Sequence, residues 1–201
     1  MAFVIINVKR QAGSKVKVDK ETRSANREAL LSAASRLLRE RGVDGVGVAE
    51  ISKAAGLTHG GFYRHFSSKE ALVGASVERT LMEQAQRAAE VVPEDGLAAF
   101  AQFYLSAAHL DDRAAGCAIA AVGGDMTRQG NEVRAAYARG ARAYLDALAP
   151  PAGPERAESL KKLAALVGAA LLARGLAGVD DALATDILTA VREERTSSPR
   201  K

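Results

Sequence analysis

The chain has 201 residues, of which 48% are hydrophobic and 4% aromatic, and its formal net charge is +4. This length allows one large or two small domains with a hydrophobic core, and the abundance of Ala, Leu, Arg and Glu favours helix. The single cysteine, Cys117, excludes an intramolecular disulfide framework and indicates a cytoplasmic protein. No apolar run is long enough to span a bilayer, so no membrane partner is expected.

Positive charge gathers in the first part of the chain. Residues 1–79 carry 14 Lys and Arg against 8 Asp and Glu, whereas residues 80–201 carry 14 against 16. This asymmetry predicts a polyanionic partner for the N-terminal part, with solvated surface charge as the alternative interpretation. Residues 1–22 are interpreted as a flexible basic arm whose segment 9–20 contacts phosphates, and residues 196–201 as a tail.

Residues 23–41 form the first predicted helix, because apolar residues recur there at helical spacing and a glycine follows that suits the left-handed end of a helix. Residues 48–55 form a second, short helix that ends at Gly56, and Thr58 caps a third, very short one. Two short helices joined by a glycine turn are typical of a helix-turn-helix.

A capping box starts a long fourth helix, because Ser67 stands three residues before Glu70. Pro93 cannot continue a helix, so this helix is expected to end near Val92. Helical periodicity then recurs in five further segments, residues 95–110, 114–126, 131–149, 155–175 and 180–194. The sequence therefore predicts an all-α protein of about nine helices.

The third predicted helix has an apolar and a polar side. Phe62 belongs to the apolar side, and the polar side offers hydroxyl, imidazole and guanidinium groups from Thr58, His59, Tyr63, Arg64 and His65. The adjacent glycines at positions 60 and 61 cost roughly 1 kcal/mol each relative to Ala in a helix. Their benefit is clearance, because a backbone without Cβ can lie close to a DNA groove. For Tyr63 and His65, packing between helices is the alternative interpretation.

The stretch VAEISKAAGLTHGGFYRHFSSKEAL, preceded by RLLRERGVDGVG, resembles the DNA-binding domain of TetR/AcrR-type transcriptional regulators. The matching residues are Ala55, Gly56, Leu57, Thr58, Gly60, Tyr63, His65, Phe66, Ser68 and Lys69. Val46 and Gly47 depart from the family pattern, which often has phosphate-binding hydroxyl residues there, so only the Gly47 amide can make that contact. The resemblance and the basic charge together imply DNA contacts from Arg23, Arg27, Gly47, Thr58, His59, Gly60, Gly61, Tyr63, Arg64, His65 and Lys69.

The resemblance also implies two domains and a homodimer. Residues 23–68 would form the N-terminal helix-turn-helix domain, and residues 69–195 a helical effector-binding and dimerisation domain. In the family the last two helices pair with their symmetry mates as a four-helix bundle; the alternative is that both apolar stripes are buried within one chain. The interface candidates are Leu160, Leu163, Val167, Leu171, Leu183, Ile187 and Leu188.

Aromatic and polarizable residues in the middle helices predict a mostly apolar cavity for a small hydrophobic or aromatic effector. The candidates are Phe100, Phe103, Tyr104, Cys117, Met126, Tyr137 and Tyr144, each with ordinary core packing as the alternative. Cys117 resembles the cysteine that opens the sixth helix in many of these regulators, some of which sense electrophiles or oxidants. Thiol-based sensing and inert packing are therefore both open for this residue.

The resulting hypothesis is a ligand-responsive regulator that binds a palindromic, double-stranded DNA operator as a dimer and is released by a small effector. A repressor is expected because the family is mostly repressive. The alternatives are a repressor that senses electrophiles or oxidants through Cys117, and a DNA-binding protein without an effector. An enzyme is not expected, because the three histidines lack metal-binding spacing and neither a G-x-S-x-G elbow nor a P-loop occurs. No cofactor or metal is expected.

Overall fold

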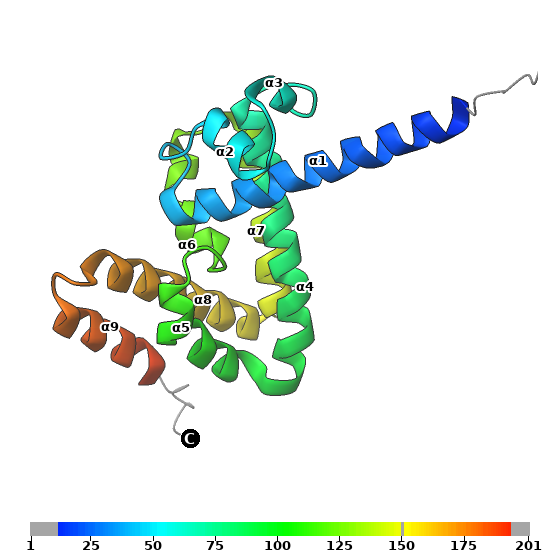
Figure 1. Cartoon of the computed structure of the whole chain (residues 1–201). Helices are drawn as coiled ribbons and strands as arrows, with labels where there is room; N and C mark the ends of the chain where they lie inside the picture. Colours follow the sequence, from blue (N-terminus) through cyan, green and yellow to red (C-terminus); the bar gives the residue numbers. More distant parts are fainter. Residues whose placement is uncertain (1–11, 150, 194–201) are drawn as a thin grey trace, which may run out of the picture.

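The computed structural model describes residues 12–149 and 151–193, and this part of the chain is built from helices without a strand (Figure 1). The first three helices form the head: α1 (Ala12–Arg41), α2 (Val48–Ala54) and α3 (His59–Phe62). The remaining elements form the body: α4 (Lys69–Tyr104), α5 (Ala107–Asp111), α6 (Ala118–Val122), the 3-10 helix η1 (Asp125–Arg128), α7 (Asn131–Leu148), α8 (Pro154–Leu176) and α9 (Asp181–Glu193). The predicted all-α fold class is confirmed.

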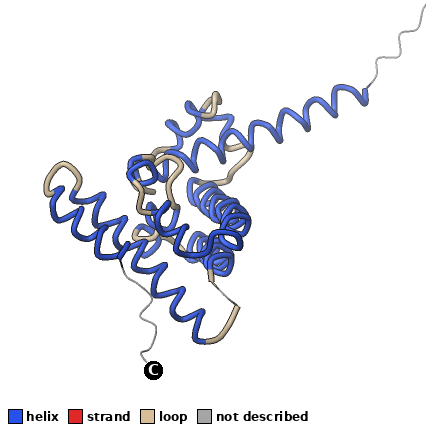
Figure 2. The backbone as a smooth tube through the Cα atoms, turned by 90° about the horizontal axis from the view of Figure 1, so that it is seen from below, coloured by secondary structure: helices blue, strands red, loops and turns tan. Residues whose placement is uncertain are grey.

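Helix α1 is longer than the sequence pattern predicted. It begins at Ala12 rather than near Arg23, so the part of the expected flexible arm that covers residues 12–22 is helical. Residues 1–11 of that arm and the tail at 196–201 lie outside the described residues. From Asp19 onward the first buried side chain of α1 is Leu30, and the N-terminal half of the helix projects away from the rest of the molecule (Figures 1 and 2).

The head is held together by a small apolar core. Phe62 of α3, Ile51 of α2 and Leu30 of α1 are completely buried. Gly42 and Gly56 have φ values of 75° and 71°, so each ends its helix in the left-handed conformation that glycine adopts without strain. The two helix ends predicted at these glycines are confirmed. The fully buried side chain of Phe62 holds α3 against the rest of the head.

The capping and the end of α4 both differ from the sequence prediction. The N-cap is Ser68, whose hydroxyl accepts a hydrogen bond from the Ala71 amide at 3.1 Å, rather than Ser67. Pro93 does not end the helix, which turns instead at Gly96 (φ 72°, ψ 172°). A proline removes one backbone hydrogen bond, but a left-handed residue redirects the chain, and glycine adopts that conformation readily.

The pairing of α4 with α7 is the main packing contact of the body. At Gly140 the two helices come so close that an added Cβ would lie 2.8 Å from the Cβ of Leu81. Across the same pair the Arg139 guanidinium donates two hydrogen bonds of 2.6 Å to the Glu78 carboxylate. Because α4 also packs against α1, this tightly packed pair connects the body to the head.

The middle of the body contains shorter helices than predicted. The helix expected at 95–110 is divided, because the Ser106 hydroxyl caps a new helix, α5, by accepting from the His109 amide at 3.3 Å. The helix expected at 114–126 contains only the five residues of α6 and part of η1. The helices expected at 131–149, 155–175 and 180–194 are confirmed within one or two residues. None of the described helices is long and apolar enough to cross a membrane.

Candidate nucleic-acid interface and ligand pocket

The outward side of α3 is polar and accessible. Thr58 is the N-cap, and its hydroxyl accepts a hydrogen bond from the Gly61 amide at 3.1 Å. Tyr63 is 55% exposed even though its ring packs edge-on against the buried ring of Phe62, with centroids 5.1 Å apart. The imidazole of His59 packs edge-on against the Tyr63 ring, with ring centroids 5.4 Å apart. The predicted contact residues Thr58, His59, Gly60, Tyr63 and Arg64 are all exposed on this surface.

The two adjacent glycines of α3 serve different purposes. A Cβ added at Gly61 would lie 3.3 Å from the Thr58 hydroxyl oxygen, so the cap itself favours a small residue there. A Cβ added at Gly60 would meet nothing within 4 Å. The fold therefore gives no steric reason for glycine at position 60, which is what a surface requiring close approach by a partner would show.

His65 follows α3 by three residues and is partly buried, and three arginines lie near it. The pKa of His65 is lowered mainly by burial, and the positive charges of Arg23, Arg27 and Arg64 lower it further. The Arg27 guanidinium also lies over the ring of Phe66, 4.9 Å from its centroid. Arg23 and Arg27, the two residues of α1 predicted to contact DNA, therefore lie near the end of α3.

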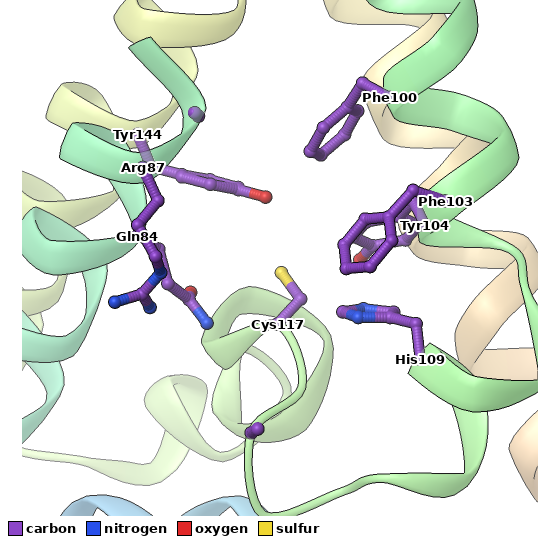
Figure 3. A pocket seen from close by; sticks show the side chains of 10 residues that line it. Gln84, Arg87, Phe100, Phe103, Tyr104, His109, Cys117 and Tyr144 are labelled. Carbon is purple, nitrogen blue, oxygen red and sulfur yellow. The ribbon is translucent and has the colours of Figure 1, made fainter. Parts of the chain in front are cut away.

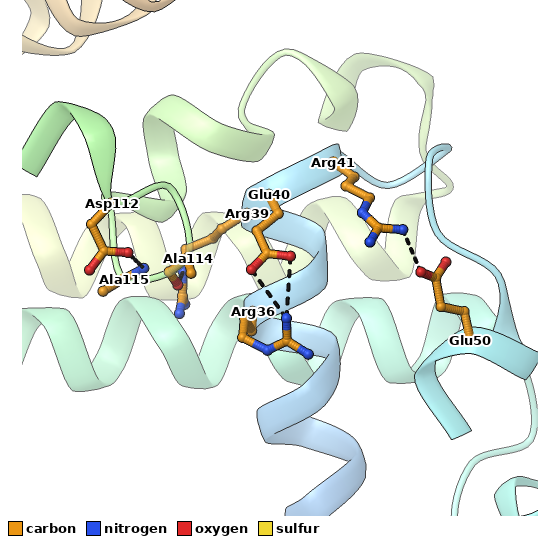
Figure 4. A network of polar contacts seen from close by, with 8 residues as sticks. All are labelled: Arg36, Arg39, Glu40, Arg41, Glu50, Asp112, Ala114 and Ala115. Carbon is orange, nitrogen blue, oxygen red and sulfur yellow. Dashed lines mark hydrogen bonds and ion pairs between the residues drawn. The ribbon is translucent and has the colours of Figure 1, made fainter. Parts of the chain in front are cut away.

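Two of the predicted contact residues also have roles within the head. The Lys69 ammonium donates a hydrogen bond of 2.7 Å to the Val43 carbonyl, so its position is fixed by the turn between α1 and α2. Gly47 is the exposed N-cap of α2, and no side chain caps that end. An ion pair between Arg41 and Glu50 joins α1 to α2 (Figure 4).

The body contains a cavity of about 240 Å³ whose walls come from α4, α5, α7 and the loop before α6. Five of the seven predicted ligand residues line it: Phe100, Phe103, Tyr104, Cys117 and Tyr144. Figure 3 shows the Cys117 sulfur between the Tyr144 ring on one side and the rings of Tyr104 and His109 on the other. Four of these five are buried, whereas Phe103 is 62% exposed.

Two polar atoms at this cavity are buried without a hydrogen-bond partner, the Tyr104 hydroxyl and Nε2 of His109. Burial lowers the pKa of His109, and the nearby Arg174 charge lowers it further. Burial, followed by the proximity of Cys117, raises the pKa of both Tyr104 and Tyr144. The imidazole and both phenols are therefore neutral near pH 7, and the cavity combines apolar walls with unused hydrogen-bonding groups.

Comparisons with known proteins agree with the geometry of the head. The family model described as bacterial regulatory proteins, tetR family, matches residues 30–75, which span the helix-turn-helix. The transcriptional repressor NemR of Escherichia coli K12 is 29% identical over 134 residues, covering 64% of this chain and 67% of NemR. This chain is therefore similar to TetR-type transcriptional regulators, in its helix-turn-helix and over the stretch that it shares with NemR.

Solved structures extend the likeness to the body of this chain. The reduced form of E. coli NemR superposes with a TM-score of 0.68 at 25% identity, covering 83% of this chain and 94% of that one. A TetR-family regulator from Agrobacterium tumefaciens has the same fold, with a TM-score of 0.67 at 22% identity and coverage of 85% and 97%. The relatives are transcriptional regulators, so this chain is a regulator rather than an enzyme.

Two predicted pocket residues lie elsewhere, and several lining residues were not predicted. Met126 is buried in η1, and Tyr137 lies against Gly123, where an added Cβ would be 3.2 Å from its hydroxyl. The unpredicted lining residues are Gln84, Arg87, Ala88, His109 and Ala115. The sequence carried no local signal for Gln84, Arg87 and His109, because polar side chains in a helix normally face solvent.

Gln84 connects α4 to the loop that carries Cys117. Its side-chain amide donates 2.9 Å to the Gly116 carbonyl and accepts 3.2 Å from the Ala118 amide. The same segment contacts the head, because Nε of Arg39 donates 2.6 Å to the Ala114 carbonyl (Figure 4). A second contact is formed by Asp125, whose carboxylate accepts 2.8 Å from the Val43 amide. The loop that carries Cys117 thus contacts α1, and η1 contacts the turn between α1 and α2.

The two final helices have an inner and an outer face. Leu163 was predicted at the dimer interface, but it is only 4% exposed and packs inside its own protomer, because α8 turns this side toward the body. Leu160, Val167, Ile187 and Leu188 are half-buried, whereas Leu171 and Leu183 are 57% and 45% exposed. Residues that the prediction omitted also belong to the outer face, namely Ala164, Leu172 and Val179.

Proposed function

We propose that this protein is a dimeric repressor that reads a palindromic operator with α3 and releases it when a small molecule fills the cavity in the body. The observation that carries this proposal is the outward face of α3. Its Tyr63 and His59 are exposed beside a glycine that the fold itself does not require. Side chains with donors and acceptors on an accessible helix are the groups that read base edges in a major groove.

The test is selection of bound sequences from a random duplex pool with the full-length protein. We expect enrichment of a palindrome whose half-sites lie about one helical turn, roughly 34–36 Å, apart. Tyr63→Ala and His59→Ala should each weaken binding to that palindrome by about 1–3 kcal/mol. A pool without enrichment, or one that yields a single unrepeated site, would contradict the proposed mode of binding.

The dimer is proposed to form through the outer face of α8 and α9. Ala164, Gly168, Leu171 and Gly175 recur at helical spacing on α8, and a Cβ added at either glycine would meet nothing within 4 Å. An apolar face with small residues at its centre permits close packing against a symmetry mate, and Leu183 of α9 continues it. A four-helix bundle of two protomers would cover this face.

Sedimentation of a Leu171→Glu variant tests the interface. Two charges facing each other across a two-fold axis should yield monomers, and operator affinity should fall with them. Lys161→Glu is the control, since Lys161 lies on the same helix and its exposed side chain forms an ion pair with its neighbour Glu158. A Leu171→Glu variant that remains dimeric would place the interface elsewhere.

The effector is proposed to be a small apolar or aromatic molecule that carries a hydrogen-bonding group. The walls of the cavity are largely aromatic and apolar, and the unpartnered Tyr104 hydroxyl and His109 Nε2 offer a specific polar contact. Arg87 lines the cavity with an exposed side chain, so an acidic group on the ligand would meet a positive charge at this point. Melting-temperature shifts across an aromatic compound library, repeated with Tyr104→Phe, test the proposal. Hits that bind the variant equally well would exclude the hydroxyl contact.

A second candidate signal is covalent modification of Cys117. Its sulfur faces the same cavity, and the related E. coli NemR has been solved in what is described as its reduced form. A small electrophile with an activated C=C bond that enters the cavity would add to this sulfur: the thiol loses its proton, a C–S bond forms as the π bond of the C=C breaks, and the neighbouring carbon takes up a proton from solvent. N-ethylmaleimide should then release operator DNA from the wild type but not from Cys117→Ser. Equal release from both proteins would exclude this route.

A further inference from the structure

The segment that contains α5 is attached to the rest of the molecule mainly at its two ends. Leu105, directly before it, is completely buried, and directly after it the Ala114 carbonyl accepts a hydrogen bond of 2.6 Å from Nε of Arg39. Between these points, none of residues 106–113 is buried. Burial of apolar surface is the main contribution that holds one element against another, and this segment receives little of it. Moving α5 therefore costs little packing.

Hydrogen bonds from two arginines hold α5 in its position. The Arg174 guanidinium of α8 donates two bonds of 3.1 Å, from Nε to the Leu110 carbonyl and from Nη2 to the His109 carbonyl. Arg192 of α9 donates to the Leu105 carbonyl at the start of the segment. The carbonyls in the last turn of a helix have no partner within the helix, so a charged donor satisfies them. The attachment of α5 to α8 and α9 is thus largely polar.

A cavity lies on each of two faces of α5. The His109 imidazole lines the cavity that contains Cys117 (Figure 3). On another face, Ala107, Leu110 and Asp111 line a second cavity of about 340 Å³, whose other walls come from α8 and α9. These three residues are spaced i, i+3 and i+4, which places them on one side of the helix. The second cavity provides space into which α5 can move away from the first.

The present position of α5 leaves one polar group unsatisfied. The His109 ring packs against the rings of Phe103 and Tyr104, with centroids 5.2 Å and 4.8 Å away. Its Nε2 is buried and has no hydrogen-bond partner among the described residues. A buried polar group without a partner is unfavourable, and movement of α5 into solvent would return this nitrogen to water. The ring contacts and arginine bonds are therefore opposed by a cost that opening removes.

We propose that α5 is a gate to the cavity that contains Cys117. When Arg174 releases its two carbonyls, residues 106–113 move into the second cavity, the His109 ring leaves the wall of the first, and that cavity opens. The statement that this gate admits an effector rests on the proposed function. The movement itself requires neither DNA nor an effector, so it can be tested separately.

Cys117 reports the movement, because it is the single cysteine of the chain and is only 2% exposed. A maleimide reaches its sulfur only when a wall of the cavity moves, so the rate of reaction with excess N-ethylmaleimide, followed by mass spectrometry, measures opening. R174Q loses both bonds to α5 and should react roughly tenfold faster than the wild type, as expected for lost hydrogen bonds from a charged donor. R142Q removes the same charge from an exposed position on α7 and should react like the wild type.

A second pair of variants tests the space behind α5 and predicts the opposite sign. Ala107 and Ala108 are both exposed on α5, but Ala107 lines the second cavity and Ala108 does not. Ala107→Leu fills part of the space into which α5 would move, so Cys117 should react several times more slowly than in the wild type. Ala108→Leu should react at the wild-type rate. General destabilisation of the fold would accelerate the reaction and cannot produce this slowing.

The dependence on urea separates local opening from global unfolding. The wild-type rate should stay nearly constant at low urea, because a local movement exposes little surface, whereas a rate limited by global unfolding rises steeply from the start. A steep rise would overturn the inference, as would wild-type rates in R174Q or in Ala107→Leu, or equal acceleration in R142Q and R174Q. In each of these cases the proposed function stands, because no DNA is involved. Conversely, a failed operator selection would contradict the proposed function and leave the measured gate movement unaffected.

Discussion

The proposed DNA-binding surface of the head comes largely from one continuous stretch, residues 47–69, whereas the cavity in the body draws on residues from Gln84 to Tyr144. In the head, Thr58 caps α3 and Phe62 fastens it, so the chemistry and the structure that presents it are neighbours in sequence. In the body, α4, α5, α7 and the loop before α6 each supply part of one wall. A surface formed by residues close in the chain can be identified from the spacing of those residues. A cavity formed by packing of distant segments cannot be identified in this way.

The two regions also differ in what their polar groups do. In the head, several polar side chains face solvent, and others form hydrogen bonds within the head: Lys69 binds the turn between α1 and α2, and Thr58 caps α3. At the cavity, the Tyr104 hydroxyl and His109 Nε2 are buried without a partner. An unpaired buried polar group costs about 1–3 kcal/mol, so the body carries an unfavourable arrangement that a ligand with a matching group would relieve.

The largest expected effect concerns the fastening of α3. Phe62→Ala should lower the free energy of unfolding by about 3–5 kcal/mol, because a completely buried aromatic ring is replaced by a cavity. Phe103→Ala is the control from the other region, and its 62% exposed ring predicts a change below about 1 kcal/mol. Urea denaturation measures both values. Equal losses would mean that the head and the cavity depend on aromatic burial to the same degree.

Gln84→Leu should have the next largest effect and lower the free energy of unfolding by about 2–3 kcal/mol. It leaves the buried Gly116 carbonyl and Ala118 amide without their partner, and each such group carries a desolvation penalty. Because this amide holds the loop of Cys117, effector affinity should fall as well. Gln86→Leu, an exposed position on the same helix, is the control. Unchanged stability in Gln84→Leu would show that water replaces the lost hydrogen bonds.

Gly60→Ala should separate the needs of the free protein from those of DNA binding. The added methyl group meets nothing within 4 Å, and Ala favours helix, so stability should rise by about 0.5–1 kcal/mol. Operator affinity should fall, because the methyl group occupies the space that we assign to DNA. Melting curves and gel shifts on the same preparation measure the two effects. If affinity is retained, DNA does not approach the backbone at this position.

The smallest expected effect is a pH dependence of stability that arises at the cavity. Burial and Arg174 lower the pKa of His109, while Asp112 acts in the opposite direction. The unfolded chain then binds the proton more readily, so stability is lost as the pH falls below the ordinary histidine value of about 6.5. His109→Gln should reduce this loss between about pH 7.5 and pH 5.5 in urea denaturation. The pKa of His65 is lowered as well, so its contribution to the pH dependence of stability has the same sign and remains in both the wild type and His109→Gln.

Several features of the fold were accessible from residue patterns alone. Apolar periodicity located most helices, and Gly42 and Gly56 were correctly predicted as helix ends because few other residues adopt a positive φ. The N-terminal extension of α1 was missed because it has no apolar stripe. The available signal was limited to the possible i, i+4 pairs Lys15–Asp19 and Lys17–Glu21. The break at Gly96 was misplaced because proline is the stronger sequence signal but not the stronger structural one there.

The sequence by itself determined the helix-turn-helix and the chemistry of its outer face, because capping, glycine turns and helical spacing act between residues close in the chain. It also determined that the last two helices carry wide apolar surfaces. Only the tertiary structure decided which of these residues face inward, as Leu163 does, and which remain outside, as Leu171 does. It likewise decided that Gln84, His109 and Cys117 share one cavity. Packing is a relation between distant segments, and no local pattern records the rotation of one helix against another.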